Sequence, residues 1–155
     1  MQLRKSLAGP IAALCTLTLI ISSQAISQED QPTPEERAYK FRTSVFQTFG
    51  WKFGQLIGAK AQDDEAAFVK HAKDLEYLAS MIEEGFQIKD SLPEGTTAKA
   101  EIWEDFETFS EKAETLRAGA KALTEPGAMA DFNPKEFGSA NCGNCHRDFR
   151  IKKDG

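Results

Sequence analysis

The sequence predicts an all-α protein, an antiparallel four-helix bundle, on three observations. Apolar residues recur at spacings of three and four along four segments, which is the period of an amphipathic helix. No segment alternates apolar and polar residues as a half-buried strand would. The connections carry proline, glycine and serine and are short, which favours antiparallel neighbours. The 155 residues suffice for one such domain and a targeting segment.

The first 25 residues are predicted to be a cleaved signal peptide. Arg4 and Lys5 precede an apolar run from Ile11 to Ile21, and a small-x-small triplet ends at Ala25. The run is shorter than the roughly 20 residues that span a bilayer. Cys15 lies inside the run and leaves with it. The mature domain then covers residues 26–155, and export predicts a periplasmic location.

Charge restricts the partners of the mature chain. Of 19 Lys and Arg residues two are lost with the first 25 residues, which leaves 17 against 24 Asp and Glu, a net charge of −7. An acidic surface disfavours nucleic acid and anionic membranes. We therefore expect neither as a partner.

The first predicted helix has a clear start. Thr33 is a candidate N-cap, a proline follows it, and Glu36 completes a capping box. The helix is predicted to run to about Ala59. Gly50 and Gly54 are unusual inside a helix and predict a bend or the close approach of another backbone. Its apolar stripe contains Phe41, Val45, Phe49 and Leu56.

Three further helices follow. The second is predicted from Asp63 or Asp64 to Gly85, the third from Ile102 to Leu123, and the fourth from Asn133 to near Lys153. The second stripe contains Phe68, His71, Leu75, Leu78 and Ile82. The third contains Ile102, Phe106, Phe109, Ala113, Leu116, Ala120 and Leu123, a bundle seam of about three heptads.

The fourth helix carries the motif with the clearest chemistry, Cys142-x-x-Cys145-His146. In this pattern two thiols form thioethers with the vinyl groups of haem, and the adjacent histidine becomes the proximal axial ligand of the iron. Cys142 and His146 are four residues apart and share a helical face. The motif predicts one covalently attached haem c.

Two rival interpretations of the motif are weaker. A thioredoxin-like Cys-x-x-Cys needs a βαβ context, which the sequence lacks. A zinc site needs more cysteine or histidine ligands, and only His71 remains. Haem attachment is the favoured interpretation.

Arg150 lies one turn after His146 and on the same face. It could lie against the proximal side of the haem and interact with propionates or an incoming ligand. It could equally be a solvated arginine that complements the C-terminus of the helix. Position alone leaves both open.

The sixth coordination position decides the function. A Met/His pair makes an electron carrier, whereas an open side admits a small gas. The candidates are His71, Met81 and Met129. Ordinary packing or surface roles are favoured for both methionines, and a core or boundary role for His71.

Motifs over the whole mature chain resemble a known family. They are Tyr39-Lys40-Phe41-Arg42-x-x-x-Phe46, Phe53-Gly54, Glu101-Ile102-Trp103-Glu104-Asp105 and Cys142-x-x-Cys145-His146-x-x-x-Arg150. The resemblance is to cytochrome c′, the class II c-type cytochromes. It implies a four-helix bundle that is often a homodimer through its first two helices. It also implies a five-coordinate high-spin iron that binds nitric oxide and carbon monoxide and discriminates against oxygen.

The resemblance also implies roles for single residues. Arg42 matches the family arginine near a haem propionate, Thr43 the next haem-contact position, and Thr97 a propionate contact before the third helix. Phe46 matches a position that is an iron-ligating methionine in the low-spin cytochrome c-556 group and leucine in many cytochromes c′. Phenylalanine cannot ligate, which favours an open but crowded apolar distal face; the alternative is a plain core residue.

The expected function is therefore gas binding by a haem protein, with nitric oxide tolerance or electron transfer as the implied physiology and a redox protein as a further partner. The alternative is a six-coordinate, low-spin electron carrier of the c-556 type, with His71 as the first candidate ligand. A peroxidase is discounted because no distal His and Arg pair is evident. We do not expect an enzyme.

Overall fold

The computed structural model describes residues 31–89 and 91–152. The predicted signal peptide, Cys15 and Lys153 lie outside the described residues. No helix in the described ranges is both long and apolar enough to cross a membrane.

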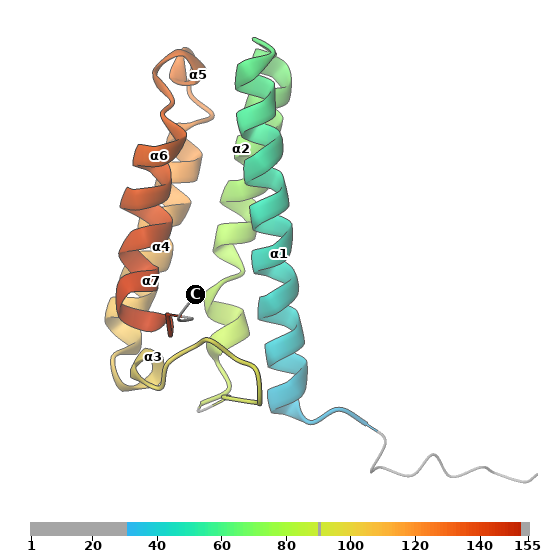
Figure 1. The fold of residues 1–155 in the computed structure, drawn as a ribbon, viewed down its shortest axis with the longest axis vertical. Helices are drawn as coiled ribbons and strands as arrows, with labels where there is room; N and C mark the ends of the chain where they lie inside the picture. The colour runs from blue at the N-terminus through green and yellow to red at the C-terminus, as the bar shows by residue number, and fades with distance from the viewer. Residues whose placement is uncertain (1–30, 90, 153–155) are drawn as a thin grey trace, which may run out of the picture. The chain divides into compact units, whose positions relative to one another are not determined.

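Four helical rods form the fold, and successive rods run in opposite directions (Figure 1). The first three are α1 (Pro34–Ala61), α2 (Glu65–Ser80) and α4 (Phe106–Ala122). The fourth is continuous and consists of α6 (Pro134–Phe137), the π-helix η3 (Gly138–Gly143) and α7 (Asn144–Phe149). Short helices η2 (Glu83–Phe86), α3 (Glu101–Glu104) and α5 (Ala128–Asp131) lie in the connections. The predicted antiparallel four-helix bundle is confirmed.

The predicted helix starts are confirmed in atomic detail. The Thr33 hydroxyl accepts from the Glu36 amide at 3.2 Å, and the Glu36 carboxylate accepts from the Thr33 amide at 2.8 Å. Asp64 caps α2 and Asn133 caps α6 through their side-chain oxygens. These bonds satisfy amide donors that have no partner within the helix.

The third predicted helix is interrupted at Asp105. This residue leaves the helical region, with φ −133° and ψ 66°, and its carboxylate accepts from the Thr108 amide at 3.1 Å. Aspartate competes for backbone donors in this way and favours caps over helix interiors. The seam persists across the break, because Ile102 and Phe109 are both almost fully buried.

The second helix ends at Ser80 rather than Gly85, and the chain continues as η2. The buried stripe of α2 is Phe68, Ala72, Leu75 and Ala79, and Ile82 continues it just after the helix. His71 therefore lies beside the stripe and not in it, with a side chain that is 15% exposed. The prediction that His71 belongs to the buried stripe is wrong, whereas the boundary role is confirmed.

The close backbone approach predicted at Gly50 and Gly54 is wrong, since a Cβ added at either position meets no described atom within 4 Å. The tight contact is instead at Gly85 in η2. There an added Cβ would lie 2.7 Å from the Arg42 Cβ and 3.3 Å from its Cα. Only glycine lets η2 pack this closely against α1.

The fourth helix ends at Phe149, before the predicted end near Lys153. Arg150 is extended, and the chain after α7 pairs with the segment before α3. The Lys99 amide donates to the Phe149 carbonyl at 3.1 Å, and the Ile151 amide donates to the Thr97 carbonyl at 2.8 Å. These bonds anchor the end of the cysteine-bearing rod.

We predict that Gly85→Ala destabilises the holoprotein by about 1–3 kcal/mol, because a new methyl group must displace α1 backbone. Gly54→Ala is the matched control, since its methyl group enters open space. The control should be neutral or gain about 0.5–1 kcal/mol from reduced backbone entropy. Guanidinium chloride unfolding measures both, and equal effects of the two substitutions would contradict the close contact.

Candidate functional site

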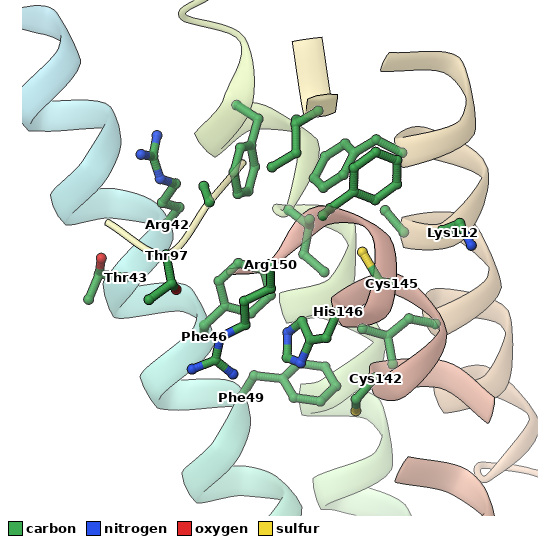
Figure 2. A pocket seen from close by; sticks show the side chains of 18 of the residues that line it. Arg42, Thr43, Phe46, Phe49, Thr97, Lys112, Cys142, Cys145, His146 and Arg150 are labelled. Carbon is green, nitrogen blue, oxygen red and sulfur yellow. The ribbon is translucent and has the colours of Figure 1, made fainter. Parts of the chain in front are cut away.

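A cavity of about 620 Å³ opens into the bundle between α1, α4 and the last rod. This volume lies within the range of ordinary ligand and cofactor sites. Figure 2 shows Arg42, Phe46 and Phe49 of α1 on one side, with Cys142, Cys145 and His146 of the last rod on the other. The lining surface is mostly apolar, so the cavity suits a flat apolar group with a few polar attachments.

The predicted cysteine motif lies entirely on this cavity. Cys142 belongs to η3, whereas Cys145 and His146 belong to α7. Both thiols are partly buried and free. The π-helix inserts an extra residue into the rod and contains the first two residues of the motif, and π-helical turns often occur at functional sites.

A buried side chain fixes that π-turn. Asn141 is 9% exposed, and its amide donates to the Phe137 carbonyl at 2.9 Å. It packs so closely on α4 that a Cβ added at Gly119 would lie 2.6 Å from its Oδ1 atom. Gly119 therefore admits Asn141, and Asn141 holds the turn that presents Cys142.

The environment of the thiols argues against a redox Cys-x-x-Cys. Burial raises the pKa of Cys142, and burial raises the pKa of Cys145 to about 11 despite the nearby Lys112. Reactive redox cysteines have lowered pKa values, because the thiolate is the nucleophile. These two thiols are held in the protonated form beside an apolar cavity.

His146 projects into the cavity with a free imidazole. Burial lowers its pKa, and the positive charge of Arg150 lowers it further. A neutral imidazole is the form that binds a metal. The Phe46 ring of α1 faces it, with ring centroids 6.5 Å apart.

Arg42 lines the cavity although it is only 4% exposed. It donates to the Ser91 hydroxyl at 3.1 Å, the Gly85 carbonyl at 3.4 Å and the Thr96 hydroxyl at 3.5 Å. Its Nη2 atom also donates to the Ser91 carbonyl. The guanidinium thus ties α1 to the segment between η2 and α3.

The charge of Arg42 is not balanced by a carboxylate. Within residues 31–89 and 91–152, no Asp or Glu side chain forms an ion pair with it. Burial lowers its pKa, although the cation persists at neutral pH. Its Cζ atom lies 5.0 Å from the centroid of the Phe86 ring. Buried charges are normally paired, so this cavity favours a ligand that carries anionic groups, as the haem propionates are.

The other predicted site residues also reach the cavity. Thr43 lies one position after Arg42 on α1, Thr97 lies in the segment paired with the C-terminus, and Arg150 follows α7. Figure 2 shows the Arg150 side chain directed toward Phe46 and His146 rather than away from the cavity. This placement favours the first of its two interpretations.

Two residues support the site in ways that the sequence alone did not predict. Lys112 of α4 lines the cavity and bonds to α7, and the Trp103 indole donates to the Phe86 carbonyl at 2.7 Å. Lys112 lies between the stripe residues Phe109 and Ala113, and from the sequence it is indistinguishable from a surface lysine because its partners are on α7. Trp103 is part of the motif that suggested the family, although its hydrogen bond could not be read from that motif.

The three candidates for a sixth iron ligand lie elsewhere, because none of His71, Met81 and Met129 lines the cavity. His71 lies beside Asp74 and Lys52, between α2 and α1. Met129 is in α5, where its backbone carbonyl accepts from Lys60. The placement of His71 gives no support to a role on the iron.

An antiparallel four-helix bundle with Cys-x-x-Cys-His on its last helix, facing an apolar cavity with a buried arginine, defines the class of c-type haem proteins built on a bundle. The family model described as cytochrome c′ matches residues 37–150. The chain belongs to the cytochrome c′ family. Its cofactor is haem c, attached through Cys142 and Cys145.

Similar proteins support this assignment along the chain. Cytochrome c′ of Halomonas halodenitrificans is 33% identical over 131 residues, 76% of this chain and 98% of the relative. Cytochrome c′ of Cereibacter sphaeroides is 31% identical over 154 residues, 90% and 97% of the two chains. A nitric oxide complex of a cytochrome c′ variant from Alcaligenes xylosoxidans has a TM-score of 0.64 at 26% identity, covering 79% of this chain and all of that one.

His71 predicts a pH dependence of stability. Burial lowers its pKa, as do the charges of Lys52 and Lys70, whereas Asp74 opposes them, and its Nδ1 atom has no hydrogen-bond partner in the described structure. A lowered pKa in the folded state means that the unfolded chain binds the proton more readily. The contribution of His71 to the free energy of unfolding is therefore complete above the pKa of histidine in the unfolded chain, about 6.5, and decreases as the pH falls below that value.

We expect the free energy of unfolding of the holoprotein to decrease between pH 7.5 and 5.5, and to decrease less in His71→Leu. Asp74 does not titrate in this window, because the hydrogen bond from Lys52 lowers its pKa. Denaturant titrations at both pH values measure the difference. Parallel profiles for the two proteins would exclude His71 as the source.

Proposed function

We propose that this protein is a periplasmic gas-binding cytochrome c′ with a five-coordinate, high-spin iron and nitric oxide as its principal ligand. The observation that carries the proposal is the composition of the cavity. His146 is the only histidine among its lining residues within the described ranges, and no methionine lines it. The iron of the bound haem supplies the site at which a diatomic gas binds, and the protein controls access to it.

The side facing His146 is crowded and apolar. Phe46 lies there, with its ring centroid 6.4 Å from that of Phe86, and Phe49 lies one turn along α1. Phe46 is 37% exposed in the open cavity, so it can move, but an incoming ligand has to displace it. Aromatic carbon also offers no hydrogen bond to the polar adduct that oxygen forms. We infer weak binding on this side, with oxygen bound least well.

We infer that nitric oxide is favoured on the other side of the haem, the side on which His146 binds the iron. Arg150 lines the cavity close enough to His146 to lower the pKa of the imidazole. A ligand that displaces His146 would meet this cation instead of the Phe46 ring. The nitric oxide complex of the Alcaligenes xylosoxidans relative agrees with nitric oxide as the ligand of this chain.

Homodimer formation through α1 and α2 belongs to the same proposal. Trp51 on α1 is 60% exposed and Tyr77 on α2 is 66% exposed. Large aromatic side chains of this kind are enriched in protein interfaces. An electron-transfer role with a redox partner is compatible with the same haem, and we propose no enzymatic activity.

Optical spectra of the purified holoprotein test the coordination state first. We expect a broad high-spin Soret band in the reduced protein that sharpens and shifts when carbon monoxide is added. A sharp low-spin spectrum that carbon monoxide leaves unchanged would instead establish a sixth protein ligand and the alternative function, a low-spin electron carrier.

Phe46→Ala should accelerate carbon monoxide binding about tenfold, because displacing a packed side chain costs roughly 1–3 kcal/mol. Ile57→Ala is the control, since it removes an exposed apolar side chain of the same helix that does not line the cavity. Stopped-flow mixing of the reduced proteins with carbon monoxide gives both rates. An unchanged rate in Phe46→Ala would reject this ring as the gate.

A further inference from the structure

One cationic side chain joins α4 to the helix that carries the iron ligand. The Lys112 Nζ atom lies 2.8 Å from Oδ2 of Asp148, 3.1 Å from Oδ1 of Asn144 and 3.3 Å from the Asn144 carbonyl. The ammonium has three protons, and these three acceptors can use all of them. Its side chain is 16% exposed, and Lys112 is among the residues that line the cavity. Figure 2 shows it on α4, beyond Cys145.

The two acceptor residues lie on either side of His146 in the sequence. Asn144 precedes it by two residues and Asp148 follows it by two, so both lie on one face of α7. Asn144 also accepts from Arg147 at 3.3 Å. Lys112 therefore holds the helix on both sides of the residue that reaches the iron.

Helix α7 depends on such contacts, because it has only six residues and follows a π-turn. At its C-terminal end the Phe149 ring packs on Phe109, and the Phe149 carbonyl accepts from the Lys99 amide. Toward its N-terminal end the bonds from Lys112 connect it to α4. Bonds to a charged donor are stronger than neutral ones, so removing them should change where α7 lies.

We propose that Lys112 is a positioning residue that fixes α7 on α4 and thereby sets the strength of the bond between His146 and the iron, and so how readily nitric oxide displaces His146. The proposal rests on the proposed function, since it takes His146 as the iron ligand. A small shift of α7 tilts or withdraws the imidazole, and misplacement by about 1 Å is enough to change reactivity strongly.

The test uses the holoprotein and the variant Lys112→Met, which keeps an unbranched side chain and removes the ammonium. Lys121→Met is the matched control, because Lys121 is an exposed lysine of the same helix. Resonance Raman spectra of the reduced protein give the iron–histidine stretching frequency. Rapid mixing with nitric oxide gives the rate at which His146 leaves the iron.

We expect the iron–histidine band to move to lower frequency in Lys112→Met and His146 to leave about threefold faster or more, with no change in Lys121→Met. Asn144→Ala combined with Lys112→Met should add little to Lys112→Met alone, since both remove the same contact. A lower thermal midpoint with an unchanged band and rate would overturn the proposal, because Lys112 would then only stabilise the fold.

If Lys112→Met does not incorporate haem, Asp148→Asn applies the same test. Asp148 is 55% exposed, so its substitution removes the ion pair at little cost to the core. A smaller shift in the same direction supports the proposal, and no shift rejects it. Absence of an iron–histidine band in the reduced, unmodified protein would reject a five-coordinate iron bound by His146, a failure of the proposed function that is visible before any variant is compared.

Discussion

The bundle depends on a hollow that its own side chains leave unfilled. Aromatic rings pack on both sides of it: Phe53, Phe68, Phe132 and Phe137 form one cluster, and Phe86, Phe109 and Phe149 form the other. The surface that lines the cavity of about 620 Å³ is largely apolar. Bound haem removes this apolar surface from water, so the free energy of haem binding adds to the stability of the fold. The thioethers of Cys142 and Cys145 make that contribution permanent.

Charge in the hollow is positive although the protein as a whole is acidic, with a formal net charge of −5. Arg42 and Lys112 both line the cavity and both hold their cationic groups by bonds to neighbouring elements. Arg42 fixes the segment from Gly85 to Thr96, and Lys112 fixes α7. Each cation thus has a structural role. Arg42, which no described carboxylate balances, also provides electrostatic complementarity to a group with carboxylates, whereas Lys112 is paired with Asp148.

Local signals in the sequence predicted most of the fold and the centre of the site. Capping at Thr33, Asp64 and Asn133 is a matter of a few neighbouring residues, and the cysteine motif is contiguous, so both could be recognised without the fold. The break at Asp105 and the edge position of His71 depend on which of two competing local bonds or faces the tertiary structure favours. Contacts between distant segments, such as Lys112 with α7 and Gly119 with Asn141, have no local signature at all.

The two sides of His146 differ in what opposes a ligand. Under the proposed function the opposition on the side of α1 is packing, since an incoming ligand has to displace Phe46 from its position beside Phe86. On the other side it is the bond of His146 itself, which α7 holds in place through its contacts with α4 and with the segment before α3. A ligand that bonds strongly enough to replace histidine overcomes the second opposition, whereas a weaker ligand meets the first. Under the proposed function, selection among gases then follows from packing and helix placement, with the Arg150 cation beside the position that His146 leaves.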